Sequence, residues 1–188
     1  MKCILLAIKL FRRVDKLYKY AITKYNPHFR DEEGRYLKED WIAISDIGKL
    51  FDGEMLTADH YMKIEDSYIQ AIQMVMEYMK IPFLLVNQVE RSFSYDTFME
   101  MNERYRELYS KELLETYTHI KDLDELDKEQ VGSFCRLVLR EDMWAKVYYP
   151  RRMKVFIGYD YLMGVHTSKS IETIIPLIEQ LGLFVEEH

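Results

Sequence analysis

Glu65 is the first residue whose position suggests chemistry inside the fold. Apolar residues recur at helical spacing from Tyr61 to Met79, and Glu65 falls within this stripe. A carboxylate deprived of water needs hydrogen-bond donors, or its pKa rises. A raised pKa is one way in which enzymes obtain a general acid or base. A structural glutamate would instead bind loop N–H groups, a tyrosine or an arginine. Because no partner acid is evident, we favour the structural role and keep the catalytic one open.

Asp160 is the second candidate, within the segment VFIGYDYLMGV at residues 155–165. The alternation in this segment predicts one central strand with two largely apolar faces. Asp160 would interrupt one buried face and would have to be hydrogen-bonded there. We predict a structural aspartate that holds a nearby loop, with an acid/base role at Asp160 as the alternative.

The segment WIAISDIGKLFDG, residues 41–53, concentrates polar residues and glycines. Ser45 is predicted to cap a short helix over 46–51, with Asp46 at the positive end of the helix dipole. Gly53 fits the left-handed position that ends helices. The segment lacks the alternating acids of a calcium loop, and the chain contains no GxGxxG or GxxxxGK[ST] motif. We therefore predict structural roles for Ser45 and Asp46.

Histidines and cysteines give no sign of a metal site or a nucleophile. The two cysteines, Cys3 and Cys135, form no CxxC pair, and no Cys/His group has zinc spacing. No GxSxG motif is present. The histidines, predicted to be ordinary surface or core residues, are His28, His60, His119, His166 and His188. We predict no metal and no cofactor.

The periodicity of the chain predicts the elements that position these candidates. Predicted strands cover 17–25, 83–89, 144–149, 153–167 and 183–187. Predicted helices cover 58–80, 96–109, a further stretch to 117, a segment that begins at Asp127, and 173–181. Thr57 is expected to cap the first helix, and Asp127 with Gln130 resembles a capping box. This order predicts an α+β fold with a mainly antiparallel sheet packed with several helices in a single domain.

The length of 188 residues and a hydrophobic content of 48% suit one domain with a full core. We assign residues 17–188 to that domain and residues 1–16 to a basic apolar N-terminal extension. The apolar run from Cys3 to Ile8 is shorter than a typical signal core and far below a membrane span. A disordered extension is favoured over a membrane or targeting role, and a start codon assigned too early would look the same.

The net charge of −6 is unevenly distributed. Residues 1–19 carry six Lys or Arg and one acid, a net +5, which leaves −11 on the remaining residues. Such a body is expected to repel nucleic acid and to attract basic partners. The two unpaired cysteines favour a reduced, cytoplasmic setting.

Three segments resemble bacterial immunity-type proteins found beside polymorphic or contact-dependent toxins. They are ITKYNPHFRDEEGRYLKEDWIAISDIG, EDSYIQAI and FIGYDYLMGV, spread over roughly residues 20–165. The resemblance implies a non-enzymatic cytosolic protein that binds and neutralises a cognate toxin domain, in many cases a nuclease with a basic surface. It transfers no specific contact residue, and residues 1–16 lie outside it.

Our first hypothesis is therefore an inhibitor that acts by tight protein–protein binding. The surface predicted for it combines acids with some of the fifteen tyrosines and includes Asp52, Asp59 and Asp66. The inhibitor hypothesis predicts no nucleic-acid partner and no membrane partner. The alternatives are a small hydrolase or transferase that uses Glu65 or Asp160 as acid/base, and a scaffold module without a toxin.

Overall fold

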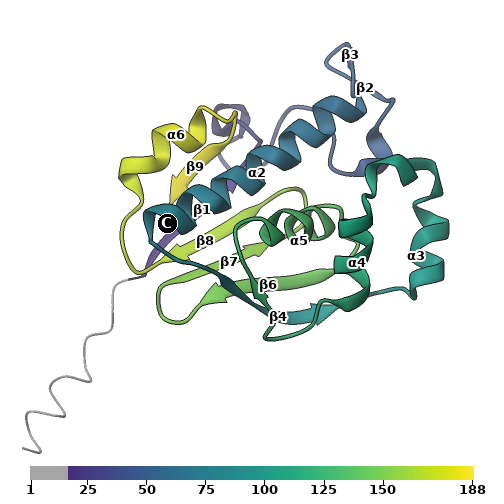
Figure 1. The fold of residues 1–188 in the computed structure, drawn as a ribbon. Helices are drawn as coiled ribbons and strands as arrows, with labels where there is room; N and C mark the ends of the chain where they lie inside the picture. The colour runs from purple at the N-terminus through teal and green to yellow at the C-terminus, as the bar shows by residue number, and fades with distance from the viewer. Residues whose placement is uncertain (1–16) are drawn as a thin grey trace, which may run out of the picture.

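A seven-stranded antiparallel sheet forms the centre of the computed structural model, which describes residues 17–188 (Figure 1). The N-terminal extension assigned to 1–16 lies outside the described residues. In sheet order the strands are β5 (Glu125–Leu126), β4 (Leu84–Glu90), β6 (Trp144–Tyr149), β7 (Met153–Ile157), β8 (Met163–Thr167), β1 (Tyr18–Thr23) and β9 (Phe184–Glu187). All neighbouring pairs are antiparallel. The predicted α+β fold with a mainly antiparallel sheet is confirmed.

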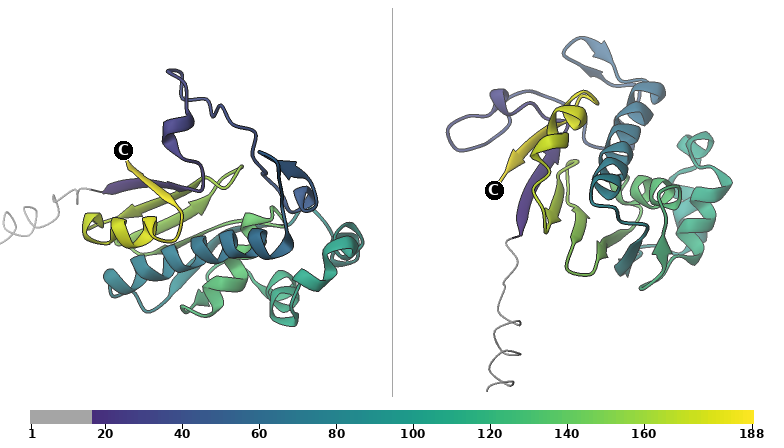
Figure 2. Two further views of the ribbon diagram at one scale, coloured as in Figure 1. Left: turned by 90° about the horizontal axis from the view of Figure 1, so that it is seen from above. Right: turned by 60° about the vertical axis from the view of Figure 1, so that its left-hand side comes forward.

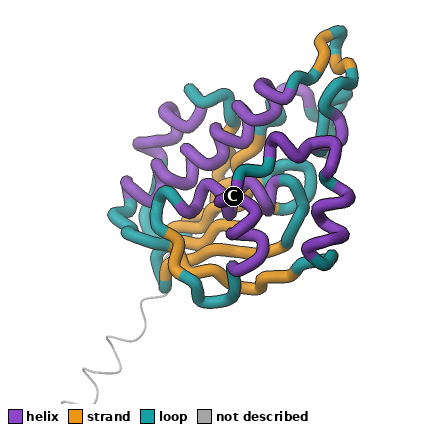
Figure 3. Tube along the Cα trace, turned by 45° about the vertical axis from the view of Figure 1, so that its right-hand side comes forward, coloured by secondary structure: helices purple, strands orange, loops and turns teal. Residues whose placement is uncertain are grey.

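The helices lie on one face of this sheet (Figures 1 and 2). They are α2 (Ala58–Tyr78), α3 (Tyr95–Met101), α4 (Lys111–His119), α5 (Gln130–Leu139) and α6 (Ile175–Glu179). α2 packs against α5 and α6, and α4 packs against α5. Short 3-10 helices cover Pro27–Phe29, Ile44–Asp46, Glu103–Leu108 and Glu172–Ile174, and a separate hairpin pairs β2 (Leu50–Phe51) with β3 (Glu54–Met55). Figure 3 shows the helical layer over the strands.

Side-chain burial follows the two layers. The residues of β7 and β8 that face the helices are buried, whereas Lys154 and its neighbours on the other face are half-buried or exposed. The apolar stripe predicted for α2 is buried except for the half-buried Ile64. The core therefore lies between the helical layer and one face of the sheet, and no helix within residues 17–188 covers the opposite sheet face (Figure 2).

Two predicted helix starts have the expected geometry. The Thr57 hydroxyl accepts a hydrogen bond from the His60 backbone N–H at 3.1 Å. The Asp127 backbone N–H donates to the Gln130 side chain at 3.1 Å, and Asp127 Oδ1 accepts from the Gln130 backbone N–H at 2.9 Å. These reciprocal bonds form the capping box at the start of α5.

The prediction of one strand over 153–167 is wrong. The chain forms β7, a turn, and β8, with positive φ angles of 54° at Asp160 and 59° at Tyr161. Asp160 is exposed in this turn and interrupts no buried face. An aspartate tolerates the left-handed conformation better than most residues, which is why it suits this position.

The helix predicted over 46–51 is also absent. A single 3-10 turn over Ile44–Asp46 takes its place, and Ser45 is exposed and makes no capping bond. Asp46 instead reaches back and accepts from the backbone N–H groups of Ile42 and Ala43 at 2.9 and 3.1 Å. Gly53 has the predicted positive φ, at 84°, but it serves the β2–β3 hairpin rather than a helix end.

Two further helix starts are shifted. Ser94, not Asp96, caps α3, through a 3.3 Å bond from the Thr97 backbone N–H. The last helical segment begins as a 3-10 turn at Glu172, one residue before the predicted start at residue 173.

Candidate functional site

Glu65 lies at the centre of a buried ionic cluster between α2 and α5. Its carboxylate accepts from Arg140 Nε at 2.6 Å and Nη2 at 2.7 Å, a bidentate pair. It also accepts from Arg136 Nη1 at 2.7 Å. The side chains of Glu65 and Arg140 are fully buried. Two guanidinium groups therefore occupy both carboxylate oxygens, and Glu65 is held as a charged structural group.

The rest of this cluster is equally well paired. The second nitrogen of the Arg136 guanidinium donates to Asp66, whose side chain is 49% exposed. Arg140 Nη1 donates to the Leu108 backbone oxygen at 3.0 Å. Burial alone would lower the pKa of Arg140, but the hydrogen bonds and charge of Glu65 outweigh burial and raise it. Every charge in this cluster is compensated within the described residues.

Asp142, a half-buried carboxyl group in the turn after α5, was not identified from the sequence. It accepts from the Tyr109 hydroxyl at 2.9 Å and from the Asn102 side-chain amide at 3.3 Å. Burial raises the pKa of Asp142 from 3.8 to about 7, partly offset by the Tyr109 hydrogen bond. The sequence contained one sign that Asp142 lies near the core. Asp142 stands between the apolar stripe of α5 and Met143, which is fully buried.

Lys24 is a third buried charge, and it explains the tryptophan of the 41–53 segment. The Lys24 ammonium group lies 4.0 Å from the ring centroid of Trp41 and 4.2 Å from that of Tyr25. It forms an ion pair with Asp40 at 3.0 Å. Burial lowers the pKa of Lys24 to about 8, against the opposing effect of Asp40. Trp41 packs in turn on Tyr61, so this cation anchors the 24–41 segment to the core.

The structure does not gather Asp52, Asp59 and Asp66 into one free acidic surface. Asp52 lies in the β2–β3 hairpin and pairs with Lys38 at 3.2 Å. Asp66 pairs with Arg136. Asp59, exposed in the first turn of α2, is the only one of the three without an ion pair to another described residue. Two of the three predicted contact residues are therefore already neutralised.

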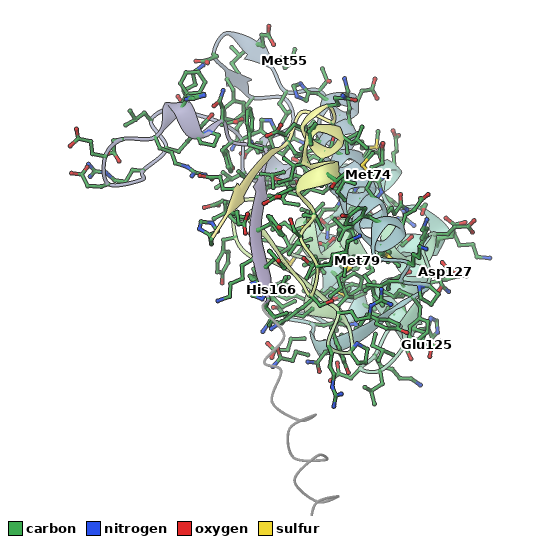
Figure 4. The ribbon with its side chains drawn as sticks, turned by 90° about the vertical axis from the view of Figure 1, so that its left-hand side faces the viewer. Met55, Met74, Met79, Glu125, Asp127 and His166 are labelled. Atoms are coloured by element: carbon green, nitrogen blue, oxygen red, sulfur yellow. The ribbon has the colours of Figure 1, made fainter. Side chains whose placement is uncertain are left out.

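A larger acidic surface lies elsewhere, in a groove between α4, β5 and the start of α5. The groove has a volume of about 730 Å³. Its charged lining consists of carboxylates from all three elements, and these are Glu112, Glu115, Asp124, Glu125 and Glu129. His119 also lines it, and no Lys or Arg from residues 17–188 does. Figure 4 shows Glu125 and Asp127 projecting from this flank of the molecule. We call this surface the acidic groove.

The carboxylates of the acidic groove are largely uncompensated. Glu115 has a surface pair with Lys111 at 3.6 Å, where both side chains are exposed. Asp124 accepts from the Lys121 backbone N–H at 3.0 Å. Glu112, Glu125 and Glu129 make no ion pair with any other residue of 17–188. The acidic groove can therefore accept several cationic side chains without first breaking strong internal pairs.

Exposed apolar side chains border α4, the helix that forms one wall of the groove. Phe93 and Tyr95 are 45% and 42% exposed, and both contact Tyr117 of α4 through its hydroxyl or ring. Leu123, in the turn after α4, is 67% exposed. None of these three side chains lines the acidic groove itself. In a protein-binding surface, apolar groups near the acids would supply affinity through burial, and the charges would supply orientation.

Other candidate chemistry has structural explanations. Cys135 is fully buried in α5, and burial raises the pKa of its thiol, which suits a packing residue. Within residues 17–188, no three His, Cys, Asp or Glu side chains are grouped closely enough to hold a metal ion. None of the helices described in that range has the length and apolar character to cross a bilayer.

No protein-family model, curated protein or solved structure matches this chain. Its function is therefore inferred from its own residues.

Proposed function

We propose that this chain is a non-enzymatic, cytoplasmic immunity-type protein that binds and neutralises a toxin domain with a basic surface. The acidic groove is the observation that carries the proposal. Five carboxylates line about 730 Å³ of open surface that contains no Lys or Arg from the described residues. The resemblance of the segments ITKYNPHFRDEEGRYLKEDWIAISDIG, EDSYIQAI and FIGYDYLMGV to immunity-type proteins agrees with this function.

The physical basis is charge complementarity. Clustered unpaired carboxylates repel one another and attract a cationic surface, which speeds encounter and fixes orientation. The exposed Phe93, Tyr95 and Leu123 beside α4 then supply apolar contact area. A nuclease toxin presents Lys and Arg where it holds phosphates. Binding across those residues would exclude the substrate.

The enzymatic alternative loses the residues on which it depended. Glu65 is buried between Arg136 and Arg140 and cannot exchange a proton with a substrate from there. Asp160 is exposed in a turn and lines a surface hollow that does not include Glu65. Glu65 and Asp160 do not line a common pocket, so their arrangement does not favour acid/base catalysis.

Growth rescue tests the proposal. The product of the gene next to the gene for this chain, which the proposal expects to be a toxin domain, is expressed with this chain, and growth and co-purification are measured. Glu112→Lys with Glu125→Lys places two cations in the acidic groove and should weaken rescue and co-purification by tenfold or more. The matched control, Glu172→Lys with Glu179→Lys, changes net charge equally on the exposed surface of the 3-10 helix Glu172–Ile174 and of α6, and this control should keep both rescue and co-purification.

Two outcomes would reject this function. A neighbouring gene product that is harmless and does not co-purify removes the toxin from the proposal. Equal losses in the groove variant and in the Glu172/Glu179 control would show that overall charge, not the acidic groove, governs binding.

A further inference from the structure

The face of the sheet opposite the helices carries a concentration of rings and cations that the proposed function does not use. Strand register places its side chains in two rows. The first row, one residue per strand from β4 to β1, is Leu85, Tyr148, Lys154, His166 and Lys19. The second row is Asn87, Lys146, Phe156, Gly164, Ala21 and Glu186. We call these two rows the open face.

Phe156 lies flat against the sheet. A Cβ built on Gly164, its cross-strand neighbour, would lie 2.1 Å from the tip of the Phe156 ring. The glycine therefore leaves the space in which the ring rests on the backbone of β8. His166 meets this ring edge-on at 5.3 Å, and Lys154 lies 5.7 Å from its centroid. The ring consequently presents its outer π-face away from the sheet, between two basic side chains.

The cations of the open face are unpaired. Lys19, Lys146 and Lys154 make no ion pair with any acid of residues 17–188, although Lys146 donates to the Gln88 side chain at 2.6 Å. Arg151, in the β6–β7 turn beside the first row, also makes none. Acids occur only toward the margins, where Glu186 is neutralised by Arg30 at 2.6 Å and Glu90 lies opposite Trp144.

His166 and a shallow hollow complete this surface. The hollow has a volume of about 330 Å³ and is lined by Tyr148, Lys154 and His166 among others. Burial, and then the charges of Lys19 and Lys154, lower the pKa of His166, as expected for a group amid uncompensated cations. Figure 4 places His166 on the flank opposite Glu125, so the open face and the acidic groove are separate surfaces.

We propose that the open face binds single-stranded nucleic acid, with bases stacked on Phe156 and Tyr148 and phosphates bound by Lys19, Lys146 and Lys154. Single-stranded nucleic acid alternates flat bases with phosphates. In the two rows of the open face, rings and cations alternate on neighbouring β-strands, which lie about 4.8 Å apart. Ring stacking with backbone neutralisation is the usual physics of single-strand binding. An acidic peptide would use the cations, but its carboxylate side chains offer no aromatic face to stack on the rings.

This inference is independent of the immunity function and changes one expectation from the sequence. A net charge of −11 on the body predicts repulsion of nucleic acid when it is treated as evenly spread. The fold separates the charge, because the acids gather around α4 and β5 while unpaired cations gather on the open face. Over a Debye length of about 8 Å at physiological salt, the local charge matters more than the total.

Fluorescence anisotropy with the full chain tests the inference. The probe is a 5′-labelled 12-nucleotide RNA of mixed sequence, with a 12-base-pair duplex of the same sequence and polyphosphate as competitors. We expect binding at 50 mM salt, with a log–log salt slope of about −2 for three phosphate contacts. The single strand should bind at least tenfold more tightly than the duplex, whose bases are already stacked.

Matched variants separate charge from stacking. Lys146→Glu with Lys154→Glu should weaken binding by tenfold or more and flatten the salt slope. Tyr148→Leu with Phe156→Leu keeps every charge and should weaken binding about tenfold or more, since stacking is worth about 1–3 kcal/mol per base. The control, Lys63→Glu with Lys121→Glu, reverses two exposed lysines away from the open face and should bind within about twofold of wild type.

Gly164→Ala is a gentler variant in case the leucine double variant is unstable. The added methyl group displaces only the tip of the Phe156 ring, so the fold should persist while stacking is lost. Circular dichroism and thermal melting verify folding of each variant.

The inference is overturned if the 12-mer RNA does not bind at 50 mM salt. It is equally overturned if folded ring variants bind as tightly as wild type, or if polyphosphate or poly-glutamate competes as well as RNA per unit charge.

Discussion

The buried cluster around Glu65 and the acidic groove around Glu125 both concentrate carboxylates, but they differ in how the charge is compensated. Glu65 accepts three hydrogen bonds from Arg136 and Arg140 at 2.6–2.7 Å, and its own side chain is fully buried. Glu125 is exposed, and no cation among residues 17–188 lines the groove around it. The charges of the Glu65 cluster are already paired within the fold, whereas those of the acidic groove are available to a binding partner.

This difference separates structural polar residues from binding residues. Removing a charge from a closed cluster leaves its partner buried and unpaired, which costs stability. Removing an exposed, unpaired charge costs the fold little but changes what the surface attracts. The same Glu→Gln substitution should therefore have opposite consequences in the two regions.

The largest expected effect is that of Glu65→Gln. Neutralising the carboxylate leaves the buried Arg140 guanidinium without a counterion, and we expect a loss of about 3–5 kcal/mol in unfolding free energy. Urea denaturation at pH 7 measures it. Asp66→Asn, at a half-exposed member of the same cluster, should cost less than about 1 kcal/mol.

A double substitution sharpens this test. Glu65→Leu with Arg140→Met replaces the buried pair by apolar side chains and should recover most of the stability lost in Glu65→Gln. A loss below about 1 kcal/mol for Glu65→Gln would contradict the view that this cluster is compensated.

An intermediate effect is expected at Asp142, a half-buried carboxyl group whose hydrogen-bond donors, Tyr109 and Asn102, are neutral. Burial raises the pKa of Asp142 to about 7. The folded protein therefore keeps this proton at pH values where the unfolded chain has lost it, and the free energy of unfolding falls as pH rises from about 4 to about 7. Asp142→Asn should remove this fall, which is at most about 4 kcal/mol for a pKa raised from 3.8 to about 7.

Urea denaturation between pH 4.5 and 8 measures the free energy of unfolding of both proteins. The variant's value is subtracted from the wild-type value at each pH. Identical pH profiles for the two proteins would show that Asp142 titrates normally, and Asp142 would then belong with the exposed acids.

Much of the fold was predictable because local patterns dominate its long elements. The apolar stripe of α2 and its Thr57 cap arise from residues close in sequence, as does the Asp127/Gln130 capping box. The 153–167 segment was misread because its alternation continues through the turn. Two residues with positive φ, Asp160 and Tyr161, reverse the chain there, and only pairing of β7 with β8 makes this visible.

The candidate site was less predictable, because compensation depends on residues far apart in sequence. The position of Glu65 in an apolar stripe indicated burial, but Arg136 and Arg140 lie more than 70 residues away. Their spacing of four residues puts both guanidinium groups on one helix face, a signal that was available. The same holds at Asp52 and Asp66, where Lys38 and Arg136, distant in sequence, form ion pairs with acids that looked free.

The smallest expected effect is that of Glu125→Gln, the substitution that matches Glu65→Gln. Glu125 has no ion pair among the described residues and lies beside other carboxylates of the acidic groove. Removing its charge relieves repulsion and should raise the unfolding free energy by less than about 0.5 kcal/mol at low salt. The gain should vanish at about 0.5 M salt, where the Debye length is only a few ångströms. A loss above 1 kcal/mol in urea denaturation would instead make Glu125 a structural residue, and the acidic groove would no longer differ in kind from the Glu65 cluster.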